Sequence, residues 1–107
     1  MYQKIKKEIL LSICIPTYNR SKIIKEKLNL LISEEVFQNN NDIEIVISDN
    51  CSIDDTEKVC LHYVNLYPEK IRYYRNDKNI RDENFELVLG YGNGKYLKIQ
   101  KDKKKRW

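Results

Sequence analysis

The sequence is poor in the residues that build disulfide scaffolds, flexible linkers and membrane spans. It has only three cysteines with no Cys-x-x-Cys pair, three glycines and two prolines among 107 residues. The odd cysteine count argues against a disulfide framework and a thiolate zinc site, and favours a reducing, cytoplasmic setting. So few glycines and prolines leave no linker-like stretch that would divide the chain. No apolar run approaches the ~20 residues that cross a bilayer, so we expect no transmembrane segment.

An excess of charge of one sign is also missing from most of the chain. Residues 1–100 carry 15 basic and 15 acidic side chains, so the net charge of +4 comes from the tail at 101–107. Without a basic face or interleaved aromatics in 1–100, we expect no nucleic-acid partner. The sequence therefore predicts one domain over 1–100, followed by a basic tail over 101–107 that we interpret as a solvated terminus.

What the sequence does contain is an alternation of strand-like and helix-like patterns. Short apolar runs predict strands over about 10–15, 43–48, 71–75 and 95–100. Amphipathic patterns predict helices over about 21–38, 54–66 and 83–91. A capping box formed by Ser52 and Asp55 is expected to begin the second helix. This order favours an α/β fold in which helices cover the faces of a mainly parallel, four-stranded sheet.

Polar residues follow the first three predicted strands directly. Thr17 and Tyr18 come after the first strand, Asp49 and Asn50 after the second, and a polar loop over 76–82 after the third. Parallel topology brings these strand ends to one edge of the sheet, where open α/β sheets bind their ligands. Tyr18 offers a flat face for stacking on a base. The Asp49 carboxylate accepts hydrogen bonds, which suits a ring N–H or ribose hydroxyls.

Simpler structural roles stay open for several of these residues. An Asx-turn that ends the strand would also explain Asp49. Tyr18 fits a half-buried loop aromatic equally well, and carboxylates such as Asp54 and Asp55 are stable in the first turn of a helix without any ligand. Nothing clearly cationic lies near Cys51 in the sequence, so this thiol is interpreted as inert packing.

Four motifs, in order along the chain, resemble the opening of family 2 glycosyltransferases of the GT-A fold. They are ICIPTYNR over 13–20, IVISDNCSIDDT over 45–56, IRYYRN over 71–76 with Asn79 and Asn84 after it, and GKYLKI over 94–99. The resemblance covers about residues 10–100. It implies a Rossmann-like GT-A nucleotide-binding half. It also implies transfer of a sugar from a nucleoside diphosphate donor, UDP-type by expectation, to an acceptor in surface polysaccharide or glycan synthesis.

The resemblance also implies which residues form the site. The donor nucleotide would be bound by Pro16, Thr17, Tyr18, Asp49, Asn50, Asp55, Asn79 and Asn84. Asp49 would bind the base. The family holds Mg²⁺ or Mn²⁺ with an Asp-x-Asp motif just after the fourth strand, where a hard cation finds carboxylate oxygens. Here Asp102 aligns with the first Asp of that motif, and Lys104 stands in place of the second.

We therefore expect an amino-terminal portion, truncated at the Asp-x-Asp region, that holds mainly the donor-binding half. It has no identified catalytic residue and is expected to be inactive alone; the alternative is a nucleotide-binding remnant without turnover. The resemblance places it in the cytoplasm, at the inner face of the membrane.

A half-domain leaves a sheet edge and apolar surface uncovered, so we also expect self-association. Arg81 stands where many family members have glycine.

Overall fold

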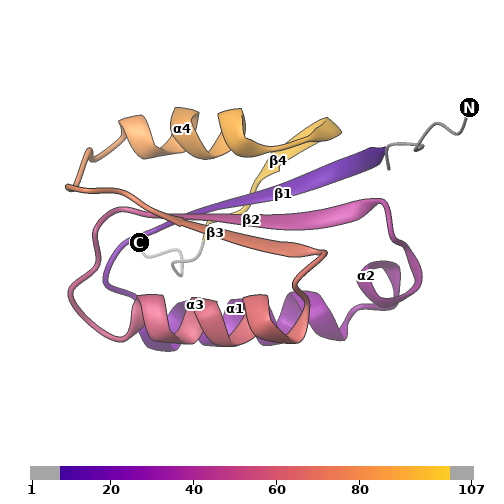
Figure 1. Cartoon of the computed structure of the whole chain (residues 1–107), viewed down its shortest axis with the longest axis horizontal. Coiled ribbons are helices and arrows are strands. Elements are labelled where there is room, and N and C mark those ends of the chain that lie inside the picture. The colour runs from indigo at the N-terminus through magenta and orange to yellow at the C-terminus, as the bar shows by residue number, and fades with distance from the viewer. Residues whose placement is uncertain (1–7, 102–107) are drawn as a thin grey trace, which may run out of the picture.

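The computed structural model describes residues 8–101. Helices cover both faces of a single sheet (Figure 1). The strands are β1 (Ile9–Thr17), β2 (Ile43–Asp49), β3 (Ile71–Arg75) and β4 (Gly94–Ile99). The helices are α1 (Ser21–Ser33), α2 (Glu35–Asn39), α3 (Thr56–Leu66) and α4 (Glu83–Tyr91). All strand pairs are parallel, in the order β3-β2-β1-β4, which confirms the predicted fold class.

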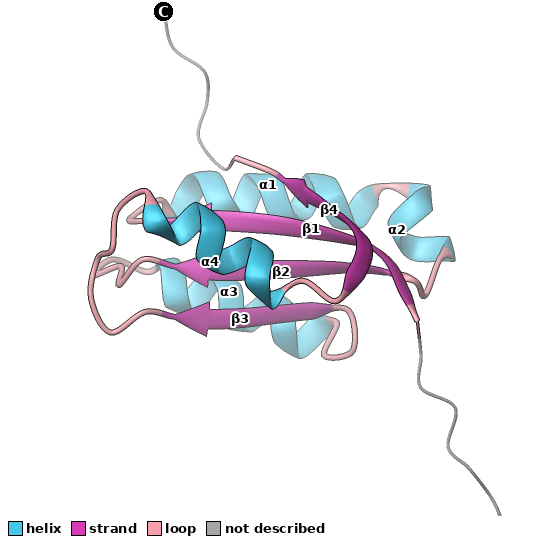
Figure 2. Cartoon of the chain, turned by 90° about the horizontal axis from the view of Figure 1, so that it is seen from above, coloured by secondary structure: helices cyan, strands magenta, loops and turns pink. Residues whose placement is uncertain are grey.

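The two faces of the sheet have different helices and different cores. Helices α1 and α3 lie on one face, where Ile15, Ile45 and Ile47 belong to the larger buried cluster. Helix α4 lies alone on the other face, where Val88 packs with Cys14 and Val46. The chain passes from β3 across the sheet to β4 (Figure 2), and a right-handed crossover in that direction puts α4 opposite α1 and α3. Strand β2 is central and buried throughout.

The predicted single helix over about 21–38 is wrong, because α1 ends at Ser33 and α2 begins at Glu35. Glu34 between them has extended backbone angles, φ −75° and ψ 138°. In one continuous helix Phe37 would point about 180° away from Leu28, since each residue turns by about 100°. The break instead lets Phe37 join the core at 2% exposure and leaves Val36 53% exposed.

Strand β4 is the least covered part of the sheet. Within residues 8–101 it pairs with β1 alone, and its Tyr96 and Leu97 side chains are 58% and 46% exposed. These residues form the uncovered edge on which the predicted self-association rests, and that association stays a prediction. None of the helices in this part of the chain is long and apolar enough to cross a membrane.

Candidate functional site

The carboxyl ends of β1, β2 and β3 lie side by side and share backbone hydrogen bonds. Thr17 is the register partner of Asp49, which is in turn the partner of Arg75. Beyond the ladder, the Asn50 amide donates to the Thr17 carbonyl at 2.9 Å, and the Asn76 amide donates to the Asp49 carbonyl at 2.8 Å. The three loops that follow these strands therefore begin next to one another, as the topology predicts.

Each of these three loops contains one non-glycine residue whose backbone lies in the left-handed region, with a positive φ. They are Asn19 (φ 48°), Cys51 (φ 67°) and Arg81 (φ 54°), and they are the positive-φ residues of the described chain. Asparagine tolerates this conformation well, whereas residues such as cysteine and arginine adopt it at a cost. Such conformations persist where the surrounding structure holds them, and they cluster at ligand sites. Local strain therefore collects at this edge of the sheet.

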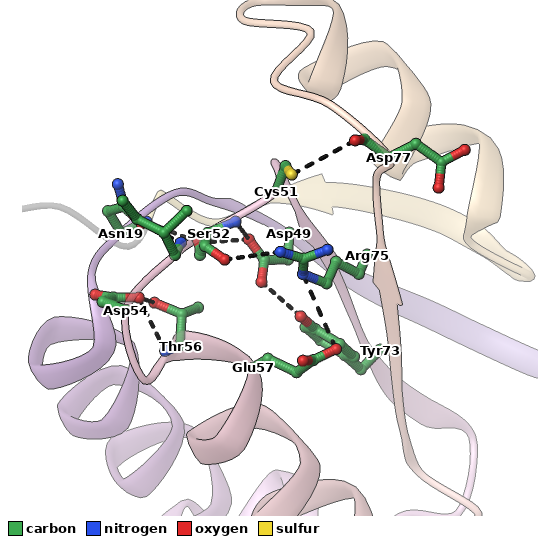
Figure 3. A network of polar contacts seen from close by, with 11 residues as sticks. Asn19, Asp49, Cys51, Ser52, Asp54, Thr56, Glu57, Tyr73, Arg75 and Asp77 are labelled. Atoms are coloured by element: carbon green, nitrogen blue, oxygen red, sulfur yellow. Dashed lines mark hydrogen bonds and ion pairs between the residues drawn. The ribbon is translucent and has the colours of Figure 1, made fainter.

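Asp49 is fully buried and holds the loop after β2 in place (Figure 3). Its Oδ1 accepts hydrogen bonds from the backbone amide and the hydroxyl of Ser52. Its Oδ2 accepts one from the hydroxyl of Tyr73 on β3. Burial, and then the hydrogen bond to Asp49, raises the pKa of Tyr73 well above its usual value, so this phenol stays protonated as a donor. These contacts show that Asp49 positions the loop after β2.

Two side-chain cross-links join the loop after β1 to the loop after β2. The backbone amide of Asn19 donates to the Ser52 hydroxyl at 2.8 Å, and the backbone amide of Ile53 donates to Asn19 Oδ1 at 2.8 Å. The two loops therefore form one unit, anchored through Ser52 to the buried Asp49.

Asp54 links the first turns of α1 and α3. It accepts hydrogen bonds from the Thr56 amide at 2.9 Å and from the Ser21 amide at 3.2 Å. Asp54 is exposed, and the slight desolvation it undergoes tends to raise its pKa, but hydrogen bonds from the Thr56 hydroxyl and the two amides outweigh this effect and lower that pKa. The predicted capping box is wrong, because Asp55 makes no side-chain cap bond and Ser52 bonds to Asp49 and Asn19. The reason is that α3 begins only at Thr56.

Side-chain amides tie the loop after β3 to the rest of the site. Asn50 Oδ1 accepts from the backbone of Ile80 at 2.8 Å and from Asn76 at 3.2 Å. Asn50 Nδ2 donates to the Arg81 carbonyl at 3.3 Å. The Asn84 side chain, 2% exposed, accepts from the Ser48 hydroxyl at 2.7 Å and donates to the Ser48 carbonyl at 2.9 Å. The asparagines thus keep the polar groups of this loop satisfied.

The three loops and the start of α4 border an open cavity of about 270 Å³, which we call the loop cavity. Its lining residues are Pro16, Thr17, Tyr18, Arg20, Asn50, Asn79, Arg81, Asp82, Asn84 and Phe85. Six of the eight residues predicted for the donor site are among them. The other two, Asp49 and Asp55, are not, because Asp49 is fully buried behind Ser52 and Tyr73 and Asp55 lies exposed at the start of α3.

Larger hollows exist elsewhere on the surface, but they lack this convergence of elements. One of about 570 Å³ lies around the turn 67–70, and one of about 620 Å³ lies along the outer side of α4. The first is at the amino ends of the strands and the second has no residue from the three strand ends. We therefore place the candidate site at the loop cavity on its chemistry and position, because ligands bind open α/β sheets at the carboxyl ends of strands.

Four lining residues are absent from the predicted donor site. Arg20 ends the first motif and Phe85 lies in the predicted helix over 83–91, so neither position suggested a role in a pocket. Arg81 and Asp82 lie in a loop whose conformation is not encoded by any periodic pattern. The sequence did give one signal, because Arg81 stands where many family members have glycine. The positive φ of Arg81 shows why glycine suits this position, since glycine adopts that backbone conformation without strain.

The described residues do not by themselves form a metal site. No group of three histidine, cysteine or acidic side chains gathers among residues 8–101. Asp102, the predicted metal ligand, lies outside the described residues, as does Lys104. None of the three cysteines forms a disulfide.

Comparison with known proteins links this geometry to a family. The family described as Glycosyl transferase family 2 matches residues 12–98. The abequosyltransferase RfbV of Salmonella typhimurium is 45% identical over 92 residues, which are 85% of this chain and 27% of that protein. The chain thus spans about a quarter of the length of this relative.

Solved structures share the fold. The mannosyltransferase PcManGT of Pyrobaculum calidifontis, solved in complex with GDP-Man and Mn²⁺, superposes with a TM-score of 0.76 at 18% identity. The alignment covers 90% of this chain and 28% of that one. S. aureus TarS, solved with UDP-GlcNAc, gives a TM-score of 0.75 at 23% identity, with 88% of this chain and 26% of that one covered. On the strength of the match over residues 12–98, with the same α/β sheet, this chain belongs to glycosyltransferase family 2.

Proposed function

We propose that this chain forms the donor-binding part of a glycosyltransferase that moves a sugar from a nucleoside diphosphate to an acceptor in surface polysaccharide or glycan synthesis. The observation that carries the proposal is that six residues of the expected donor site line one cavity at the carboxyl ends of parallel strands. The solved relatives with GDP-Man and with UDP-GlcNAc support a nucleotide sugar as the ligand class. A UDP-type donor is the first candidate.

Two side chains have the chemistry to hold the nucleoside. Tyr18 lines the cavity and is 42% exposed, so its ring is available for stacking on a base. Asn50 lines the cavity too. Its Oδ1 already accepts from Ile80 and Asn76, but within residues 8–101 its Nδ2 donates only to Arg81 and keeps a second N–H that can donate to an acceptor on a base. We therefore transfer the base contact predicted for Asp49 to this N–H of Asn50, since the buried Asp49 already accepts from Ser52 and Tyr73.

The residues that line the loop cavity would account for binding of the donor and not for transfer of its sugar. An inverting transfer needs a general base that deprotonates the acceptor, and none of residues 8–101 has been assigned this role. We propose that Asp102 contributes one carboxylate to a site for Mg²⁺ or Mn²⁺, a cation that would neutralise the donor diphosphate. We further place the protein in the cytoplasm, at the inner face of the membrane, a setting that the three cysteines without disulfides suit.

Calorimetric titration of the chain with UDP, CDP and GDP, each with and without Mn²⁺, tests the proposal. We expect UDP to bind, and Tyr18→Ala to weaken that binding by about tenfold, because stacking of one base on an aromatic ring contributes about 1–3 kcal/mol. Tyr96→Ala is the matched control, since Tyr96 is an exposed tyrosine on β4 that does not line the cavity. Absence of binding for all three nucleotides, or equal effects of the two tyrosine variants, would contradict the proposal.

The metal arm of the same titration separates two forms of the proposal. Tighter binding in Mn²⁺ that is lost in Asp102→Ala supports a cation site built with Asp102. Binding that is indifferent to Mn²⁺ supports the alternative of a nucleotide-binding remnant.

A further inference from the structure

We propose that Arg81 binds the diphosphate of the donor and thereby makes the loop cavity selective for phosphorylated nucleosides. The inference rests on the proposed function and adds a residue that the predicted donor site did not include. Three independent observations carry it: the place of Arg81 in the cavity, its backbone conformation, and the balance of charge around it.

The backbone of Arg81 is held on both sides while its guanidinium is left for a ligand. The backbone amide of Arg81 donates to Asn79 Oδ1 at 2.8 Å. The Arg81 carbonyl accepts from Asn50 Nδ2 at 3.3 Å and from the backbone amide of Asn84 at 3.1 Å. All three partners line the same cavity. The polar contacts described for Arg81 within residues 8–101 are made by its backbone, so the guanidinium has no protein acceptor there. The loop contacts thus fix the backbone of Arg81 at the edge of the cavity, and they leave its guanidinium unpaired within residues 8–101.

The conformation of Arg81 is one that its side chain makes costly. At φ 54° the residue lies in the left-handed region, which glycine adopts freely and which clashes with a Cβ atom. The asparagine contacts around it over-determine this geometry, as is found for strained residues at ligand sites. An arginine in a position suited to glycine is understandable when its side chain contributes something that glycine cannot, and here the residue is exposed and lines the cavity.

The charge of the cavity matches a phosphate ligand. Among its ten lining residues two are arginines, Arg20 and Arg81, and one is acidic, Asp82. The planar fork of a guanidinium pairs with phosphate oxygens through two parallel, charge-assisted hydrogen bonds. A nucleoside alone would gain nothing from this cation, whereas a nucleoside diphosphate would. The chemistry therefore points to the phosphorylated part of the ligand.

The test compares a charged and an uncharged ligand on the same chain, in EDTA and at one ionic strength. We expect UDP to bind at least tenfold more tightly than uridine. Arg81→Gly should weaken UDP binding about tenfold and leave uridine binding unchanged, because only the charge-assisted contact is removed. Lys78→Gly is the matched control: it removes one positive charge from the same loop, at an exposed residue that does not line the cavity, and should change neither affinity by more than twofold.

A second variant separates charge from loop stiffness. Arg81→Gln keeps a long polar side chain and the backbone restraint of a non-glycine residue, so it should also lose UDP affinity and retain uridine affinity. Equal affinity of the wild-type chain for UDP and uridine, or equal effects of Arg81→Gly and Lys78→Gly, would overturn the inference and leave the proposed function intact. Loss of uridine binding in Arg81→Gln would overturn it too, since the role would then be structural. Failure of the wild-type chain to bind either ligand would overturn the proposed function itself.

Discussion

Strand β2 carries a buried carboxylate near each of its ends, and the two have different surroundings. Glu44, near the amino end, is 5% exposed, and Asp49, at the carboxyl end, is fully buried. Both accept hydrogen bonds from several partners, as buried charges must. They differ in what their partners hold in place. The partners of Glu44 bond within a closed set, whereas Ser52, a partner of Asp49, bonds to Asn19 in the loop that brings Tyr18 to the cavity.

The network around Glu44 closes on itself. Glu44 accepts from the Ser12 hydroxyl and from the Asn93 amide, and it pairs with Arg72 at 3.0 Å. Arg72 also donates to the carbonyl of Tyr91 at 2.7 Å. None of these residues lines the loop cavity. The network joins β1, β2, β3 and the turn before β4, so it holds the fourth strand against the sheet.

Close packing reinforces this closed end of the molecule. The Gly94 amide donates to the Ser12 hydroxyl at 2.7 Å, and a Cβ atom at Gly94 would lie only 2.6 Å from the Ser12 backbone nitrogen. Any side chain there would force the turn away from β1. At the other end, Asp49 supports loops that leave Tyr18, Asn50 and Arg81 around an opening. A buried charge therefore does not mark a site unless the groups it positions face a space that a ligand can enter.

The largest expected effect breaks the closed network. Glu44→Ala should lower the free energy of unfolding by about 3 kcal/mol, because it leaves Arg72 and two other donors without their buried acceptor. Urea unfolding measures this loss. Calorimetry on the folded variant in the cold should find UDP affinity within twofold of the wild-type value. Glu69→Ala, which removes an exposed glutamate, is the control, and an equal loss in both variants would refute the structural role given to Glu44.

The next effect sharpens the contrast at the other end of β2. Asp49→Asn should lower the free energy of unfolding by about 2 kcal/mol, since an amide cannot accept from Ser52 and Tyr73 at both of its polar atoms. Unlike Glu44→Ala, it should also weaken UDP binding, because the loop that carries Asn50 loses its anchor. The same pair of measurements applies. A loss of stability with unchanged affinity would place Asp49 in the same class as Glu44.

A smaller effect has the opposite sign. Arg81→Gly should raise the free energy of unfolding by about 0.5 kcal/mol, the relief of a left-handed arginine less the greater freedom of glycine in the unfolded chain. Thermal unfolding would show a correspondingly small rise in Tm. Lys78→Gly, which relieves no strain, should show no rise. Stability gained at Arg81 together with UDP affinity lost would show that this loop favours binding over stability.

The smallest effect depends on pH. The pKa of Asp54 is lowered in the folded state, so the carboxylate stabilises the fold above its unfolded pKa of about 4, and this contribution is lost as pH falls through the folded value. Asp54 is exposed, so solvent screens the effect and we expect it to be slight. Urea unfolding of the wild-type chain and Asp54→Asn should differ more at pH 6 than at pH 3. A constant difference across this range would contradict the linkage.

Much of the fold was predictable because its signals are local. The strand over 71–75 and the helix over 83–91 have the bounds that the periodicity predicts, and the other strands differ by one or two residues at their ends. The break of the first helix at Glu34 was missed because it depends on Phe37 reaching a core that forms only when distant segments pack. The start of α3 was missed for a related reason, since Ser52 is drawn to Asp49 and Asn19 rather than to the helix.

By itself the sequence determined the alternation of strands and helices, and hence that polar residues after parallel strands meet at one edge, because periodicity and topology follow from residue spacing. Only the tertiary structure decided which of those residues line the loop cavity. Asp49 and Asn50 are neighbours and both are buried, yet the pairing of β2 with β1 and β3 leaves only Asn50 in the wall of the cavity. The place of Arg81 was likewise decided by asparagine contacts from other segments, which no local pattern records.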